Sequence, residues 1–156
     1  VIAIIGVLAA ILVPSMMGYV GDSKLSTANA NAKLVYTNTA TYATKCEVAG
    51  YPMNAACTIA TATSLQEANV TGQVAAPTVQ PTGTDLTNAL KQLMGSSTTA
   101  AGVFKVDVNA SGTPTFAAWA KTADDQYVGA YPNATTAKTA GKIAGVTATF
   151  TGDATN

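Results

Sequence analysis

The chain has 156 residues, a formal net charge of zero and a charged fraction of 10%, well below the roughly 25% of typical soluble domains. This length suits one modest domain with an appendage and excludes two large domains. The lysines are scattered and there is no arginine, so no basic stripe could neutralise a nucleic-acid backbone, and no specific nucleic-acid partner is predicted.

The absence of histidine restricts the chemistry further. Histidine is the commonest general base near neutral pH and the commonest metal ligand. Asp124 and Asp125 are the only adjacent carboxylates, and a pair of acids in a loop between strands is usually a solvated turn. We therefore predict no catalytic, cofactor-binding or metal-binding residues and no enzymatic activity. An enzyme tethered to a membrane is the alternative of a different class.

The first twenty residues, VIAIIGVLAAILVPSMMGYV, carry no charge, and the first ionisable side chain is Asp22. A helix that is apolar on all sides requires lipid or other apolar helices as neighbours. A cleaved signal peptide would have a basic start, and a simple anchor would have a basic flank. Neither feature is present, and the helical periodicity continues past Lys24, so we predict one long helix.

The continuation carries an apolar stripe with spacings of three and four that should lie on a folded head. Its members are Leu25, Ala28, Ala32, Val35, Tyr36, Tyr42 and Ala43. Threonine and asparagine fill the other positions and are poor helix formers, so packing must stabilise this half. Pro14 should kink the helix, and Gly6 should add local freedom.

We place a boundary after the long helix, with an N-terminal helix over residues 1–46 and a head over 47–156. Cys46 and Cys57 flank a stretch with Gly50, Pro52 and Asn54 that can reverse the chain. A disulfide between them is predicted, and closing a loop of this size contributes about 3 kcal/mol in the chain-entropy model. Two reduced, buried thiols are the alternative.

Two helices are predicted in the first part of the head. Ser64 and Glu67 have the spacing of a capping box on a helix of one or two turns. Thr84 and Asp85 should cap a longer helix that ends before Gly95. Its apolar face consists of Leu86, Ala89, Leu90 and Leu93.

Alternating apolar residues predict strands in the remainder of the head. Residues 104–108 and 116–120 should form a hairpin around a turn at 109–113, with further strands at 126–131 and 146–150. An antiparallel sheet with one polar and one apolar face needs a cover, which the long helix can provide. The predicted fold class is therefore α+β, a long N-terminal helix packed on a small antiparallel sheet.

The N-terminal run resembles that of type IV pilins and pseudopilins, which share a hydrophobic helix with glycine and proline at the positions of Gly6 and Pro14. The segment GAYPNATT at residues 129–136 is faintly similar to pilins of Gram-positive anaerobes. The family's N-methylated phenylalanine and its glutamate would precede Val1. The family's disulfide usually bounds a C-terminal loop, whereas Cys46 and Cys57 directly follow the long helix.

This resemblance implies a structural subunit, a major pilin, of an extracellular filament that serves adhesion, motility or aggregation. The subunit would reside in the cytoplasmic membrane before assembly, with a prepilin peptidase and the pilus assembly machinery as partners. Identical subunits would form a helical homo-oligomer, and loss of helical order between Gly6 and Pro14 would let it stretch. The residues expected to pack in the filament core are Val1, Ile2, Ile4, Ile5, Val7, Leu8, Ile11, Leu12, Val13, Met16 and Met17.

Other interpretations remain open within the same fold. A pseudopilin of a type II secretion or DNA-uptake machine is the main alternative. An electron-conducting filament would depend on Tyr19, Tyr36 and Tyr42, whose spacing core packing also explains. Three Asn-x-Ser/Thr triplets, at Asn69, Asn109 and Asn133, are candidate glycosylation sites that arise easily by chance in such a chain.

Overall fold

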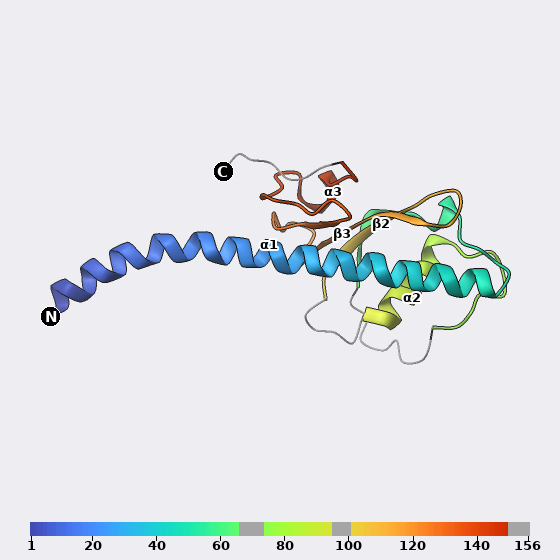
Figure 1. Ribbon diagram of the computed structural model, residues 1–156, viewed down its shortest axis with the longest axis horizontal. Coiled ribbons are helices and arrows are strands. Elements are labelled where there is room, and N and C mark those ends of the chain that lie inside the picture. The colour runs from blue at the N-terminus through green and yellow to red at the C-terminus, as the bar shows by residue number, and fades with distance from the viewer. Residues whose placement is uncertain (66–73, 95–100, 150–156) are drawn as a thin grey trace.

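The computed structural model describes residues 1–65, 74–94 and 101–149. A long helix projects from a small head that contains every strand (Figure 1). The elements are α1 (Ile2–Val48), the 3₁₀ turn η1 (Ala55–Cys57), β1 (Ile59–Ser64), α2 (Gly83–Met94), β2 (Val103–Val108), β3 (Pro114–Ala120), β4 (Gly129–Tyr131) and α3 (Lys142–Gly145). The layout is α+β, as the sequence predicts.

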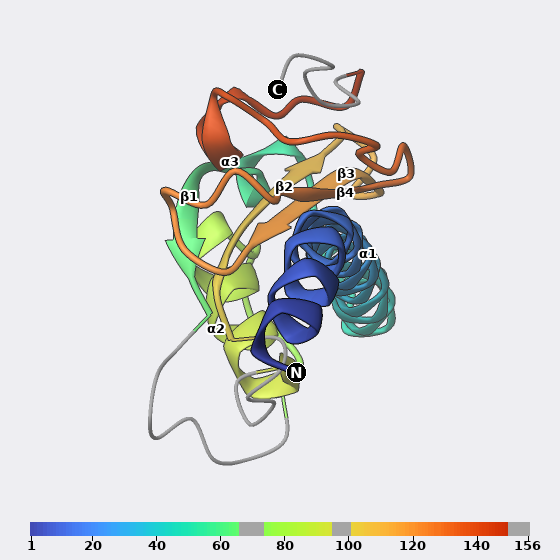
Figure 2. The same ribbon diagram turned by 90° about the vertical axis from the view of Figure 1, so that its left-hand side faces the viewer.

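The four strands form one antiparallel sheet in the order β1-β2-β3-β4. The predicted hairpin is confirmed, because Phe104 pairs with Trp119 and Val106 pairs with Ala117. Helices α1 and α2 lie on one face of the sheet, and the segment that contains α3 lies on the other (Figure 2). The head therefore has three layers.

Helix α1 confirms the prediction of one long helix, and it continues through Pro14 as far as Val48. Its N-terminal half curves gently away from the axis of the C-terminal half (Figure 1). Threonines in the C-terminal half bond the carbonyl four residues earlier, which accommodates poor helix formers within the helix. These are Thr27, Thr37, Thr39, Thr41 and Thr44.

The predicted apolar stripe of α1 faces the head. Leu25, Ala28, Ala32, Val35 and Tyr42 are buried, and Tyr36 and Ala43 pack beside them. All of them except Leu25 join side chains of α2 and of the sheet in the larger of the two cores. Packing against the head thus holds this half of the helix, in agreement with the sequence analysis.

The closest approach of α1 to the sheet occurs at Gly129 in β4. A Cβ added there would lie 2.0 Å from the carbonyl carbon of Ala28, so only glycine fits. The neighbouring Asn29 completes the contact, since its Oδ1 accepts from the N–H groups of Ala130 (3.0 Å) and Thr135 (3.1 Å). Its Nδ2 donates to the Thr135 carbonyl at 2.8 Å. We call these five residues the helix clamp.

The sheet departs from the sequence prediction in three respects. The strand expected at 126–131 is limited to β4, and the one expected at 146–150 is wrong over its described residues, where a short helix ends in Gly145 and a turn follows. The remaining strand is instead β1. The sheet also lacks the expected polar face at β3, because Phe116, Ala118 and Ala120 are buried under the C-terminal layer and Ala117 and Trp119 are buried on the opposite face.

Helix α2 matches the prediction except at its cap and at Leu93. Leu86, Ala89 and Leu90 are buried as expected, together with Met94, whereas Leu93 is 36% exposed. The backbone N–H and hydroxyl of Thr82 donate to Asp85, so the cap is Thr82 and not Thr84. These bonds lower the pKa of Asp85. The capping box expected at Ser64 and Glu67 extends outside the described residues.

Replacement of Gly129 by alanine should strongly destabilise the head, because the backbone of Ala28 cannot move aside as a flexible side chain would. We expect a loss of about 3 kcal/mol in the free energy of unfolding, measured by urea titration in detergent. Gly145→Ala is the matched control, since an added Cβ there meets no atom within 4 Å. Equal stability of the two variants would contradict the clamp.

Candidate functional site

The apolar half of α1, residues 1–20, stands free of the head and is the feature with the clearest functional meaning. We call it the apolar segment. Every predicted filament-core residue in it is exposed, from 55% at Leu8 to 95% at Val1. Large apolar side chains are therefore in solvent along its whole length in the isolated chain. A surface of this kind requires a partner or a lipid environment.

The length of the apolar segment matches a bilayer. At about 1.5 Å per residue, the helix from Ile2 to Val20 spans about 28 Å, close to the roughly 30 Å of a hydrocarbon core. Its backbone is satisfied by helical bonds, beginning with Ile5 N–H to Val1 at 3.3 Å. Pro14 has no N–H to donate, so the carbonyl of Ala10 lacks its usual helical partner.

The continuous exposure of the α1 side chains ends where the helix meets the head. Gly21 is half-buried, and a Cβ there would lie 3.1 Å from the hydroxyl of Tyr127. Leu25 is the first buried side chain of the helix. The helix clamp follows one turn later, and the Tyr36 hydroxyl donates to the Pro114 carbonyl at 2.9 Å. The rigid half of α1 therefore begins within a turn of the apolar segment.

Cys46 and Cys57 are both buried free thiols in the larger core. The predicted chain reversal between them is present, since Gly50 adopts a φ of +83° after α1 and Asn54 caps η1. Cys57 Sγ donates to the Pro81 carbonyl at 3.2 Å. Burial raises the pKa of both thiols, so little thiolate forms at neutral pH. The disulfide stays a prediction.

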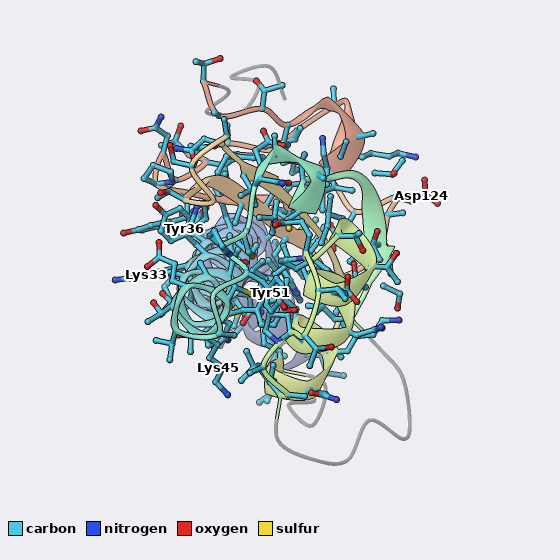
Figure 3. The ribbon with its side chains drawn as sticks, turned by 90° about the vertical axis from the view of Figure 1, so that its right-hand side faces the viewer. Lys33, Tyr36, Lys45, Tyr51 and Asp124 are labelled. Carbon is cyan, nitrogen blue, oxygen red and sulfur yellow. The ribbon has the colours of Figure 1, made fainter. Side chains whose placement is uncertain are left out.

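The adjacent acids Asp124 and Asp125 have different partners. Asp124 is exposed and forms an ion pair with Lys142 at 2.5 Å, which lowers the pKa of its carboxyl. Asp125 Oδ1 accepts the Tyr127 N–H at 2.9 Å. Figure 3 places Asp124 at the periphery of the head, away from Lys33, Tyr36 and Lys45. Both carboxylates thus fit the solvated turn that the sequence favours.

The remaining candidates have structural partners where they are described. Asn109 Oδ1 accepts from Ser111 and Thr113, and Asn133 Nδ2 donates to the Ala148 carbonyl. Asn69 lies outside the described residues. Of the helix tyrosines, Tyr19 is exposed, Tyr36 stacks edge-to-face on Tyr131 at 4.8 Å, and Tyr42 is buried. Burial, followed by the nearby Cys46, raises the pKa of Tyr42.

Among the described residues, α1 is the one helix long and apolar enough to cross a membrane, judged by length and composition. Its best window has a mean hydropathy of 2.2, and none of that window is buried. One such helix near the N-terminus also fits a signal sequence. Comparison with protein-family models, curated proteins and solved structures finds no match to this chain.

We predict that the chain exported by its own cells carries the Cys46–Cys57 disulfide. Without reductant, neither thiol should be alkylated after denaturation, and adding dithiothreitol should lower the free energy of unfolding by about 3 kcal/mol. A variant with both cysteines changed to alanine should not respond to dithiothreitol. Two alkylated cysteines in the unreduced exported chain would show that the thiols are structural.

Proposed function

We propose that this chain is the structural subunit of an extracellular filament of the type IV pilus kind, a major pilin. The observation that carries the proposal is the exposure of the whole apolar segment beside a well-packed head. The segment has the length and composition for a membrane, and its helix continues without a break into the head. The proposal assigns no catalytic role to any residue.

The physical basis of assembly is the retention of apolar burial. Before assembly the apolar segment lies in the cytoplasmic membrane with the head outside. In the filament the same side chains pack against the apolar segments of identical subunits. Transfer from lipid to a helical core keeps these side chains out of water at both stages, so assembly does not expose them.

Two glycines of the apolar segment are better explained by packing between subunits than by packing within one chain. A Cβ added at Gly6 or Gly18 would meet no atom within 4 Å. The fold of one chain therefore gives no packing reason for the absence of a side chain there. Small residues on an apolar helix allow close approach of a neighbouring helix, which is the function that we assign to them.

The proposal implies partners that act before the filament exists. The chain would be processed by a prepilin peptidase and moved from the membrane by a pilus assembly machine. Its final location would be the cell surface, where the head meets solvent and any adhesive target. Gln80 and Thr61 of β1 belong to this outward surface of exposed polar side chains.

The test is a comparison of two variants that introduce the same charge in cells that make the protein. Leu8→Lys places an ammonium in the apolar segment, where it costs roughly 3 kcal/mol in a hydrocarbon environment. Thr61→Lys places one on exposed β1. Filaments sheared from the cells are examined by electron microscopy and mass spectrometry.

Wild type and Thr61→Lys should yield thin filaments composed mainly of this chain, whereas Leu8→Lys should yield none while the head remains folded. Sheared fractions that lack the wild-type chain, with the chain held in the membrane, would overturn the major-pilin proposal. That outcome would favour a pseudopilin or a tethered domain. Filaments of normal abundance from Leu8→Lys would show that the apolar segment does not pack in the core.

A further inference from the structure

A cleft of 420 Å³ opens where α1 enters the head. Lys24 and Thr27 of α1 form one wall, and Trp119, Lys121 and Tyr127 from β3 and the segment after it form the other. That segment lies at the end of the head nearest the apolar half of α1 (Figure 1). The cleft thus lies beside the part of α1 that leads to the apolar segment.

Two ammonium groups, those of Lys24 and Lys121, line the cleft, and that of Lys138 lies over the Tyr127 ring beside it. Lys24 Nζ lies 5.4 Å from the centre of the Tyr127 ring, and Lys138 Nζ lies 5.7 Å from it. Lys121 Nζ is 3.5 Å from the Ala101 carbonyl. Within the described part of the chain none of the three is in an ion pair with a carboxylate. Their charge is therefore available to an anion.

The neighbouring carboxylates cancel this charge only in part. Asp125 lines the cleft and accepts the Tyr127 N–H, and its single negative charge is outweighed by the ammonium groups of Lys24 and Lys121 that line the same cleft. Asp124 is paired with Lys142. Asp22 precedes Lys24 by two residues, so the two side chains leave the helix on different sides. The cleft retains an excess of positive charge.

The position of the cleft along α1 indicates which kind of anion it binds. Lys24 follows Val20, the end of the apolar segment, by four residues, which corresponds to about 6 Å along the helix. When the apolar segment crosses a bilayer, Lys24 lies at the depth of the headgroups. Lysine, tryptophan and tyrosine are the side chains typical of that depth.

We propose that this cleft binds the phosphate of an anionic phospholipid headgroup while the chain is in the membrane. The inference rests on the membrane stage of the proposed function. Lys24 and Lys121 contact the phosphate, and the ring of Tyr127 lies against the glycerol and upper acyl region, while Trp119, which is buried in the larger core, lines the cleft from the protein side. The bound lipid holds the head against the membrane surface until the subunit is extracted.

The experiment uses the full chain reconstituted in vesicles of phosphatidylcholine with increasing fractions of phosphatidylglycerol. Trp119 is the sole tryptophan of the chain, so quenching of its fluorescence by a headgroup spin-labelled lipid reports the approach of the cleft to the surface. Co-flotation with neutral vesicles measures membrane insertion independently. The variants are Lys24→Gln, Lys121→Gln and the matched control Lys33→Gln.

Lys33 is a fair control because it lies on the same helix and its Nζ is 5.9 Å from the Tyr131 ring, an equivalent contact. It is about 20 Å beyond Val20 and so cannot reach the headgroups. We expect Lys24→Gln and Lys121→Gln each to raise the phosphatidylglycerol fraction at half-maximal quenching about fivefold. Lys33→Gln should leave it unchanged.

Identical curves for all variants, in chains that co-float normally, would overturn the lipid inference and leave the filament proposal intact. A chain that fails to co-float with neutral vesicles would remove the membrane stage, and the inference with it. Inorganic phosphate, compared with chloride at equal ionic strength, should not shift the curve. Loss of quenching in phosphate would assign the cleft to a free anion instead.

Discussion

The contact between the backbones of Ala28 and Gly129 is the constraint on which the rest of the structure depends. It brings α1 directly against β4, and the hydrogen bonds of Asn29 fix the rotation and the height of the helix at that point. A helix that is rich in threonine and asparagine has little intrinsic stability. The clamp supplies a tertiary reason for its straight C-terminal half, and it determines which residues of α1 remain outside the head.

One helix consequently serves two environments. Beyond the clamp, its side chains alternate between a buried stripe and an exposed threonine-rich face. In the apolar segment, the large apolar side chains are exposed on all sides of the helix in the isolated chain. The division falls within about one turn, near Gly21 and Leu25. A filament subunit needs this arrangement, because the head must be complete before assembly while the apolar segment must be free to exchange lipid for protein neighbours.

The long helix, α2 and the β2–β3 hairpin could be predicted because their apolar residues recur with a clear period. β1 was missed because its sequence IATATS combines small and polar residues and has a burial pattern without strict alternation. The strand expected at 146–150 was wrong over residues 146–149, because a short helix from Lys142, which has a φ of +54°, to Gly145 comes directly before them and a turn ends them. The alternation of apolar residues from Val146 onward does not indicate the helix that precedes it.

The clamp itself was beyond the reach of pattern analysis. Nothing in the sequence around Asn29 distinguishes it from the other asparagines of the helix, and its hydrogen-bond partners lie more than a hundred residues later. In the sequence, Gly129 is marked only by its place in the segment 129–136, which is faintly similar to pilins of Gram-positive anaerobes. The cleft at Lys24 could not be predicted for the same reason, because its walls come from α1 and from β3 and the segment after it, which are far apart in the sequence. By contrast, the exposed apolar segment was evident from the absence of charge before Asp22.

The most direct test of the central claim is a cryo-electron microscopy reconstruction of filaments formed by this chain. It should place the apolar segments of neighbouring subunits together at the filament axis, with the heads outside and the clamp intact in each. A reconstruction in which residues 1–20 lie on the outer surface, or in which heads alone make the contacts, would contradict the claim that this segment builds the filament.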